Sequence, residues 1–185
     1  FTYRAVTQSS RSVPLLRKTL KRLLREDGCQ GGTYRYKGIC NVFDSLSTEF
    51  LFTTNVVQLA ETIDRVLESE QEQAARSNVV QIGRTDTAFV LAAMPRGHWS
   101  ESLGKTLEDL LREKTGASYC DSGMFVGRYN TILLHFFLTG TKPISTETKE
   151  ALEQELVSLC TPWQTRLYHA LVASIIQQGA ESSKA

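Results

Sequence analysis

The stretch VVQIGRTDTAFVLAAM, residues 79–94, decides the fold class of this chain. Ala88–Met94 is a continuous apolar run, which is typical of a strand in the middle of a sheet. Asn78–Arg84 predicts a shorter strand before it, and the Thr85-Asp86 pair predicts the turn that joins the two. The stretch therefore predicts two neighbouring strands, of which the second is fully buried.

Toward the C-terminus, helices and strands continue to alternate. Ser100 predicts the N-cap of a leucine-striped helix that stops at Gly116. Residues 118–126 and 130–138 predict two more strands, and Ser145 opens another helix. The order from residue 78 to residue 178 is thus β-β-α-β-β-α. It predicts an α+β, two-layer sandwich with a ferredoxin-like topology or a permuted relative of it. A last helix is predicted from Trp163 to about Gln178, followed by a disordered tail over 179–185.

Residues 1–77 predict a helix-strand-helix segment that precedes this domain. Pro14 begins a helix that Gly28 ends, and its apolar face carries five leucines: Leu15, Leu16, Leu20, Leu23 and Leu24. TYRYKGICNVF, residues 33–43, is rich in aromatic and β-branched residues and predicts a strand. Asn55 predicts the N-cap of a second helix, whose polar end at residues 68–78 we interpret as a linker between the two parts.

Composition is that of an ordinary globular chain, with 41% hydrophobic and 22% charged residues and a net charge of +1. Residues 1–27 hold seven Lys or Arg but only two acidic residues. Aromatic side chains do not alternate with these basic ones, which weighs against nucleic-acid binding. No apolar run approaches the roughly 20 residues that a membrane span needs, so we expect no membrane partner. The start at Phe1 suggests a piece of a longer chain.

Chemical motifs are missing from the sequence. It contains no GxGxxG, no GxxxxGK[ST] and no GxSxG, so we expect no catalytic residue and no bound cofactor in this chain. The four cysteines form no CxxC pair, and the three histidines fall on different predicted elements, so no metal site is expected. Reduced thiols are typical of a cytoplasmic protein, which is the predicted location.

Two groups of residues remain as candidates. Arg96, His98 and Ser100 lie where a strand leads into a helix N-terminus, a place that suits the carboxylate or phosphate of a small effector. The alternative, which we favour, is an ordinary loop with a helix cap. Cys120 and His135 lie on neighbouring predicted strands and could form a thiolate–imidazolium pair. Here we favour a buried, unreactive cysteine and a histidine with a local partner.

Four segments resemble, in order, the N-terminal regulatory region of the large NAD-specific glutamate dehydrogenases of bacteria. They are RSVPLLRKTLKRLL (11–24), YRYKGICNVFDSLSTEFLF (34–52), VVQIGRTDTAFVLAAMPRGHWSESLGKTLEDLL (79–111) and LVSLCTPWQTRLYHAL (156–171). Met94-Pro95-Arg96 is similar to the family's proline-arginine pair at the end of a strand. Thr85-Asp86-Thr87-Ala88-Phe89 departs from the family's Phe-Gly-Arg-Phe-like hairpin.

The resemblance implies an ACT-like, ferredoxin-like regulatory module. The parent protein would oxidise L-glutamate to 2-oxoglutarate and ammonium with NAD, and its catalytic residues would lie outside this chain. The chain would then serve regulation or assembly. Its partners would be the remainder of the parent chain, further copies in a homo-oligomer and a small amino-acid effector. The alternative is a stand-alone binding module for nucleic acid or a small anionic ligand.

Overall fold

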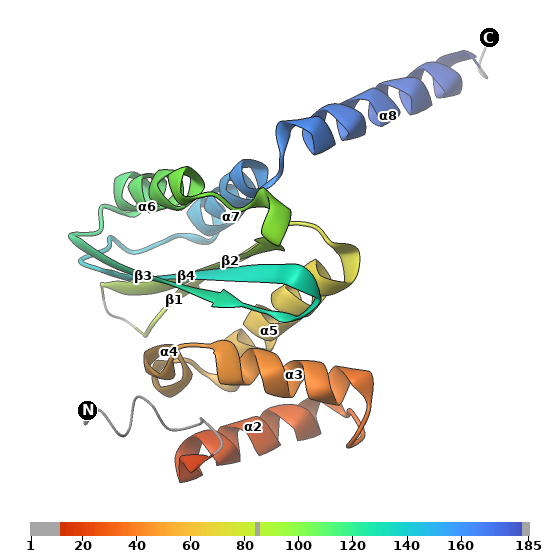
Figure 1. Ribbon diagram of the computed structural model, residues 1–185. Helices are drawn as coiled ribbons and strands as arrows, with labels where there is room; N and C mark the ends of the chain where they lie inside the picture. The colour runs from red at the N-terminus through yellow and green to blue at the C-terminus, as the bar shows by residue number, and fades with distance from the viewer. Residues whose placement is uncertain (1–11, 84–85, 183–185) are drawn as a thin grey trace.

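A four-stranded antiparallel sheet forms the centre of the computed structural model, which describes residues 12–83 and 86–182 (Figure 1). The strands are β1 (Arg76–Gln81), β2 (Thr87–Pro95), β3 (Tyr119–Val126) and β4 (Thr131–Thr139), in the spatial order β1-β2-β4-β3. Because β4 lies between β2 and β3, the helix α6 (Glu101–Thr115) that joins those two makes a split β-α-β unit.

Strand β2 confirms the prediction of a buried central strand. Every residue from Ala88 to Met94 is buried, since β2 has strands on both sides and helices on both faces. The successive side chains point to opposite faces. Ala88, Val90 and Ala92 therefore pack with one layer of helices, and Phe89 and Leu91 with the other. The turn predicted at Thr85-Asp86 falls partly on residues 84–85, outside the described residues.

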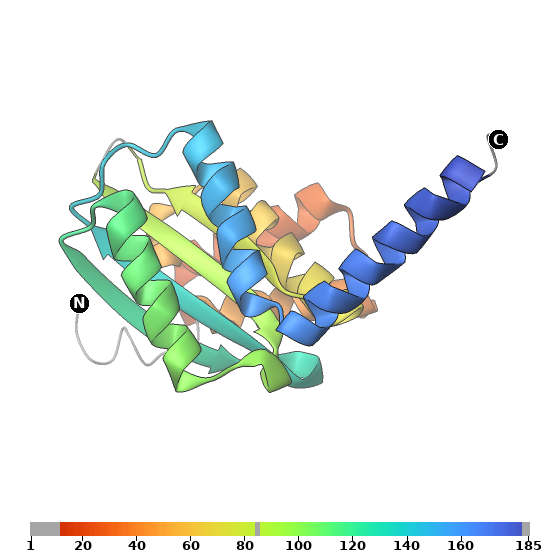
Figure 2. The same cartoon turned by 90° about the horizontal axis from the view of Figure 1, so that it is seen from above.

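Helices α6 and α7 (Thr146–Cys160) cover one face of the sheet, as Figures 1 and 2 show. Both predicted N-caps are present: the Ser100 hydroxyl accepts the Leu103 N–H at 3.1 Å, and the Ser145 hydroxyl accepts the Thr148 N–H at 3.1 Å. Gly116 ends α6 in the left-handed conformation, also as predicted. These two helices and the sheet form two layers, whereas residues 163–178 of the predicted domain belong to the separate helix α8.

A second set of helices packs on the opposite face, which the sequence did not predict. It consists of α2 (Pro14–Asp27), α3 (Tyr34–Ser45), α4 (Thr48–Thr53) and α5 (Val56–Glu72). Phe50 of α4 stacks on Phe89 of β2, with ring centroids 3.8 Å apart. One apolar core therefore runs from α2 through α3 and α5 to the sheet, across the boundary predicted at residue 77.

The strand predicted over residues 33–43 is wrong, because these residues form α3. Thr33 caps the helix by accepting the Tyr36 N–H at 3.3 Å. Ile39, Val42 and Phe43 recur at helical spacing and are buried against the neighbouring helices. Burial of this apolar face outweighs the modest β-propensity of the individual residues.

The last helix, α8 (Trp163–Ser182), projects away from the rest of the molecule (Figures 1 and 2). It starts where the sequence predicted and continues beyond Gln178, so only residues 183–185 of the predicted tail lie outside the described residues. None of the helices in the described ranges combines the length and apolar character that crossing a bilayer requires.

Candidate functional site

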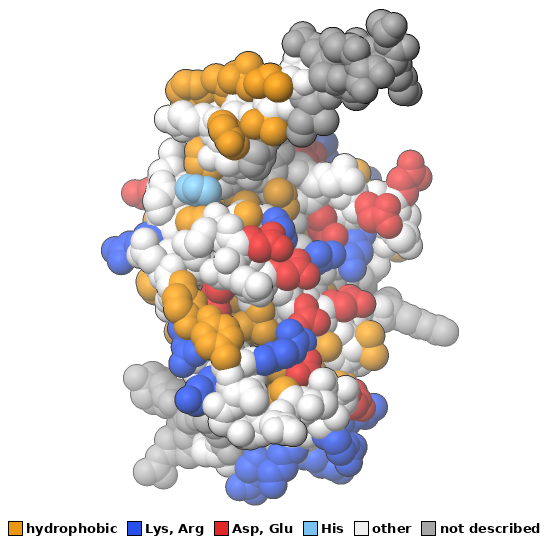
Figure 3. All heavy atoms as spheres, turned by 90° about the vertical axis from the view of Figure 1, so that its right-hand side faces the viewer, with side chains coloured by type: hydrophobic (Ala, Val, Ile, Leu, Met, Phe, Trp, Pro, Cys, Tyr) orange, Lys and Arg blue, Asp and Glu red, His pale blue; other side chains and the backbone are white. Residues whose placement is uncertain are grey.

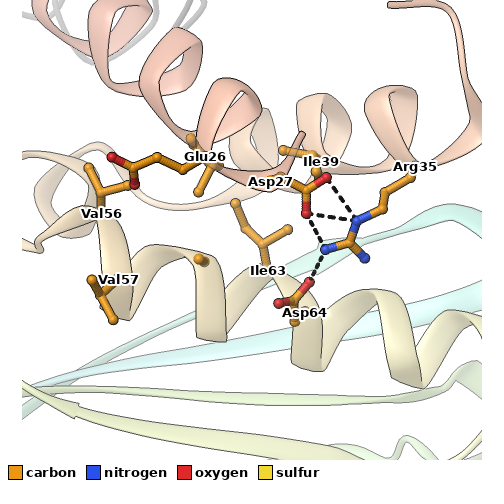
Figure 4. A pocket seen from close by; sticks show the side chains of 10 residues that line it. Glu26, Asp27, Arg35, Ile39, Val56, Val57, Ile63 and Asp64 are labelled. Atoms are coloured by element: carbon orange, nitrogen blue, oxygen red, sulfur yellow. Dashed lines mark hydrogen bonds and ion pairs between the residues drawn. The ribbon is translucent and has the colours of Figure 1, made fainter. Parts of the chain in front are cut away.

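A cavity of about 220 Å³ lies between α2, α3 and α5 (Figure 4). Its apolar wall is made by residues from all three helices: Leu23 of α2, Ile39 of α3, and Val56, Val57, Ala60 and Ile63 of α5. Leu23, Ile39 and Ile63 belong to the apolar core, so this wall is fixed by packing. Its charged members are Glu26, Asp27, Arg35 and Asp64.

Arg35 ties the three helices together at this cavity. Its Nε donates to both carboxylate oxygens of Asp27, at 2.8 and 3.0 Å, and its Nη2 donates to Asp27 as well. The same Nη2 donates to Oδ1 of Asp64 at 2.8 Å. One guanidinium on α3 thus holds a carboxylate from α2 and another from α5, a fork geometry that lysine could not reproduce.

These ion pairs shift the ionisation of their members. The Arg35 guanidinium hydrogen-bonded to Asp27 lowers the pKa of that carboxyl, and Asp27 together with Asp64 raises the pKa of Arg35. Burial, and then the neighbouring Asp27, raises the pKa of the Cys29 thiol. The lowered pKa keeps the Asp27 carboxylate charged at neutral pH.

The predicted effector loop lies on the other side of the sheet, before α6. Arg96 to His98 form a single 3-10 turn, and Arg96 is exposed. The Ser100 hydroxyl is engaged by the helix cap, and Trp99 lies against Gly104, where a Cβ would come within 2.7 Å of its ring. Burial lowers the pKa of His98, whose Nδ1 has no hydrogen-bond partner in the described part of the chain. The loop as an effector site stays a prediction.

Cys120 and His135 point to opposite faces of the sheet. Cys120 is paired with Leu138 and lies in the core under α6 and α7. His135 is paired with Gly123, and its ring stacks near Phe89 on the other face, at 6.2 Å between centroids. Burial raises the pKa of Cys120 to about 11 and lowers the pKa of His135, so both favour their neutral forms. The two do not form a catalytic pair.

Cys120 should therefore alkylate slowly at pH 7, because the thiolate is the reacting species and its pKa is raised. We expect iodoacetamide, followed by peptide mass spectrometry, to label Cys120 fully only after the chain is unfolded in urea. Labelling of Cys120 in the folded chain as fast as that of a free thiol would contradict this expectation.

Sequence reasoning missed the helical cavity, because Arg35 was assigned to a strand. One signal could have found it: Ile39, Val42, Phe43 and Leu46 recur at intervals of three and four residues after Thr33, a preferred N-cap residue. Within residues 12–83 and 86–182 there is no group of three side chains that could hold a metal ion.

Fold and cavity define the class of protein first: an α+β segment whose antiparallel sheet carries a helical subdomain on one face. Comparison with known proteins then shows which proteins the chain is similar to. Residues 13–72, which are α2 to α5, match the family described as "Glutamate dehydrogenase, helical motif 1".

Two curated relatives extend the match over most of the chain. The chain is 24% identical over 182 residues to the NAD-specific glutamate dehydrogenase of Halomonas elongata, which covers 97% of this chain and 11% of that protein. It is 22% identical over 165 residues to the enzyme of the same name from Pseudomonas aeruginosa, covering 89% of this chain and 10% of that protein. The predicted resemblance to the NAD-specific glutamate dehydrogenases is confirmed, whereas its ACT-like and regulatory character stays a prediction. The chain spans about a tenth of the length of these relatives.

Proposed function

We propose that this chain is a non-catalytic assembly and regulatory segment of an NAD-dependent glutamate dehydrogenase. The parent would oxidise L-glutamate to 2-oxoglutarate and ammonium and reduce NAD, with its catalytic and NAD-binding residues elsewhere. The relation to the NAD-specific glutamate dehydrogenases supports this parent reaction. The strand order β1-β2-β4-β3 with its split β-α-β unit supports a permuted ferredoxin-like, ACT-like module.

The uncovered apolar face of α8 carries the assembly role. Five large side chains of this helix are between 50% and 67% exposed: Trp163, Leu167, Tyr168, Leu171 and Ile175. Trp163, Leu167, Leu171 and Ile175 follow one another at intervals of four, so they form a ridge along one side of the helix. Figure 3 shows apolar side chains gathered on this helix at the top of the molecule.

Such a face needs a partner surface. Most helical stability in proteins comes from packing of an apolar face rather than from the propensity of the residues. Between Trp163 and Ile175 the sequence has one charged residue, Arg166, so the helix gains little from solvation of charges. We propose that the partner is the remainder of the parent chain in another copy of a homo-oligomer.

Charges placed on the ridge should disrupt assembly of the full-length parent. We expect Leu167→Glu with Leu171→Glu to change its oligomeric state in light scattering, because two carboxylates would be forced into an apolar interface. Ala151→Glu with Gln154→Glu adds the same two charges on exposed positions of α7 and should leave assembly unchanged. A parent carrying the α8 substitutions that assembles and turns over glutamate like the wild type would refute the assembly role.

The isolated chain supplies the test of its non-catalytic nature. Incubated with L-glutamate and NAD, it should form no NADH, whereas the full-length parent should. Turnover by the isolated chain would refute this part of the proposal.

The loop of Arg96, His98 and Ser100 stays our candidate site for a small amino-acid effector. Calorimetry with a panel of amino acids, on the wild-type chain and on Arg96→Ala, tests it.

A further inference from the structure

We propose that the helical cavity between α2, α3 and α5 binds a small organic cation: an apolar group of a few carbon atoms that carries one protonated amine. This proposal is supported by the lining of the cavity, in which an apolar wall of six side chains lies next to three carboxylates and one guanidinium (Figure 4). The inference does not depend on the proposed assembly role, since α8 contributes no residue to this cavity.

The apolar part of the ligand would lie against the wall formed by α5. Val56, Ala60 and Ile63 share one side of that helix at spacings of three and four residues, and Ile39 and Leu23 face them from α3 and α2. Ile63 and Ile39 are 1% and 2% exposed, so this part of the wall is held in place by the core behind it. A preformed apolar surface of this kind favours binding of a ligand's apolar group.

The charges at the cavity select the sign of the ligand. Arg35 already forms ion pairs with Asp27 and Asp64. The Glu26 carboxylate forms an ion pair with Arg22, in which Oε1 lies 2.7 Å from the Arg22 Nε. Asp64 and Glu26 accept these hydrogen bonds through Oδ1 and Oε1, respectively. Three carboxylates against one guanidinium leave the lining negative. An ammonium group therefore gains, and a carboxylate group is repelled.

The volume of the cavity limits the size of the ligand. A volume of about 220 Å³ holds roughly seven water-sized groups at about 30 Å³ each. An alkylamine of six carbons matches that volume and places its nitrogen at the carboxylate rim. The chemical class is therefore a short aliphatic or cyclic primary amine rather than a nucleotide or a long acyl chain.

Three probes of one chain length test the sign and the site together. Hexylamine, hexanol and hexanoate are titrated at pH 7 into the 185-residue chain with labelled Ile, Leu and Val methyl groups. We expect hexylammonium to shift the methyl resonances of Ile39, Ile63 and Val56, and hexanol to bind about fivefold more weakly, as loss of one half-exposed ion pair implies. Hexanoate should bind more weakly than hexanol.

Two matched pairs of variants locate the binding. Ala60→Leu fills the cavity and should abolish the shifts, whereas Ala151→Leu on the exposed face of α7 should leave them unchanged. Asp64→Asn should reduce the preference for hexylammonium over hexanol about fivefold. Glu61→Gln, at an exposed position one helical turn before Asp64, should leave that preference unchanged. Absence of binding by hexylammonium, or equal binding of the three probes, would overturn the proposal. So would binding that survives both Ala60→Leu and Asp64→Asn.

Discussion

Phe50→Ala should destabilise this chain by about 3–5 kcal/mol, the usual cost of deleting a buried phenylalanine side chain. Phe50 and Phe89 are both 0% exposed, and their rings stack at an interplanar angle of 15°. The pair is the place where the short helix α4 meets the central strand. Its loss would leave a cavity between the helical layer and the sheet, which the neighbouring core residues could fill only in part.

Phe125→Ala is the matched control, because it deletes the same side chain from a position that is 43% exposed at the sheet edge. We expect this change to cost less than about 1.5 kcal/mol, in line with substitutions that leave the core intact. Urea denaturation followed by circular dichroism measures both values. If the two substitutions cost the same, the Phe50–Phe89 stack does not join the two layers.

Gly140→Ala should cost about 2–4 kcal/mol, because it combines backbone strain with a steric clash. Gly140 follows β4 with φ +73°, a left-handed conformation that an L-residue adopts only at a cost. A Cβ there would come within 2.2 Å of the Ser118 Oγ and 3.2 Å of the Ser118 nitrogen. That nitrogen donates to the Thr139 carbonyl at 2.9 Å, so the clash would disturb the start of β3.

Gly28→Ala separates the two causes. Gly28 has φ +70°, but nothing lies within 4 Å of the Cβ it would gain, so only the strain of about 1–2 kcal/mol applies there. Adding Ser118→Gly to Gly140→Ala should restore the stability lost to the steric clash, but not the stability lost to backbone strain. Thermal unfolding of the three variants and the wild type gives the comparison. Equal costs for Gly28→Ala and Gly140→Ala would show that Ser118 yields without penalty.

Local signals predicted the C-terminal half of the fold well. Ser100, Gly116 and Ser145 form the caps that their residue types favour, because capping depends on hydrogen bonds within one turn of chain. The strand β2 was equally predictable from its apolar run, since a strand that is buried on both faces does not alternate apolar and polar residues. Such features depend on neighbours in sequence, which is why one sequence suffices to predict them.

The candidate site was far less predictable. Asp27, Arg35 and Asp64 come from three different helices, and no spacing along the chain marks them as partners. The strand predicted over residues 33–43 concealed the contact of Arg35 with Asp27 and Asp64. Side chains alternate between two faces in a strand but follow a 3.6-residue period in a helix, so the prediction gave Arg35 the wrong direction. The position of the Arg96–Ser100 loop, by contrast, followed directly from the strand and helix on either side of it.

By itself, the sequence determined which segments alternate between strand and helix after residue 78, where their caps lie, and which family the chain resembles, because these depend on local residue preferences and ordered strings. Only the tertiary structure decided that residues 34–45 are helical, that α2 to α5 cover the second face of the sheet, and that a cavity opens among them. The physical reason is burial: Phe43, Phe50 and Phe89 become one core only when segments distant in sequence meet. The free energy of that contact exceeds the local preference of any single segment.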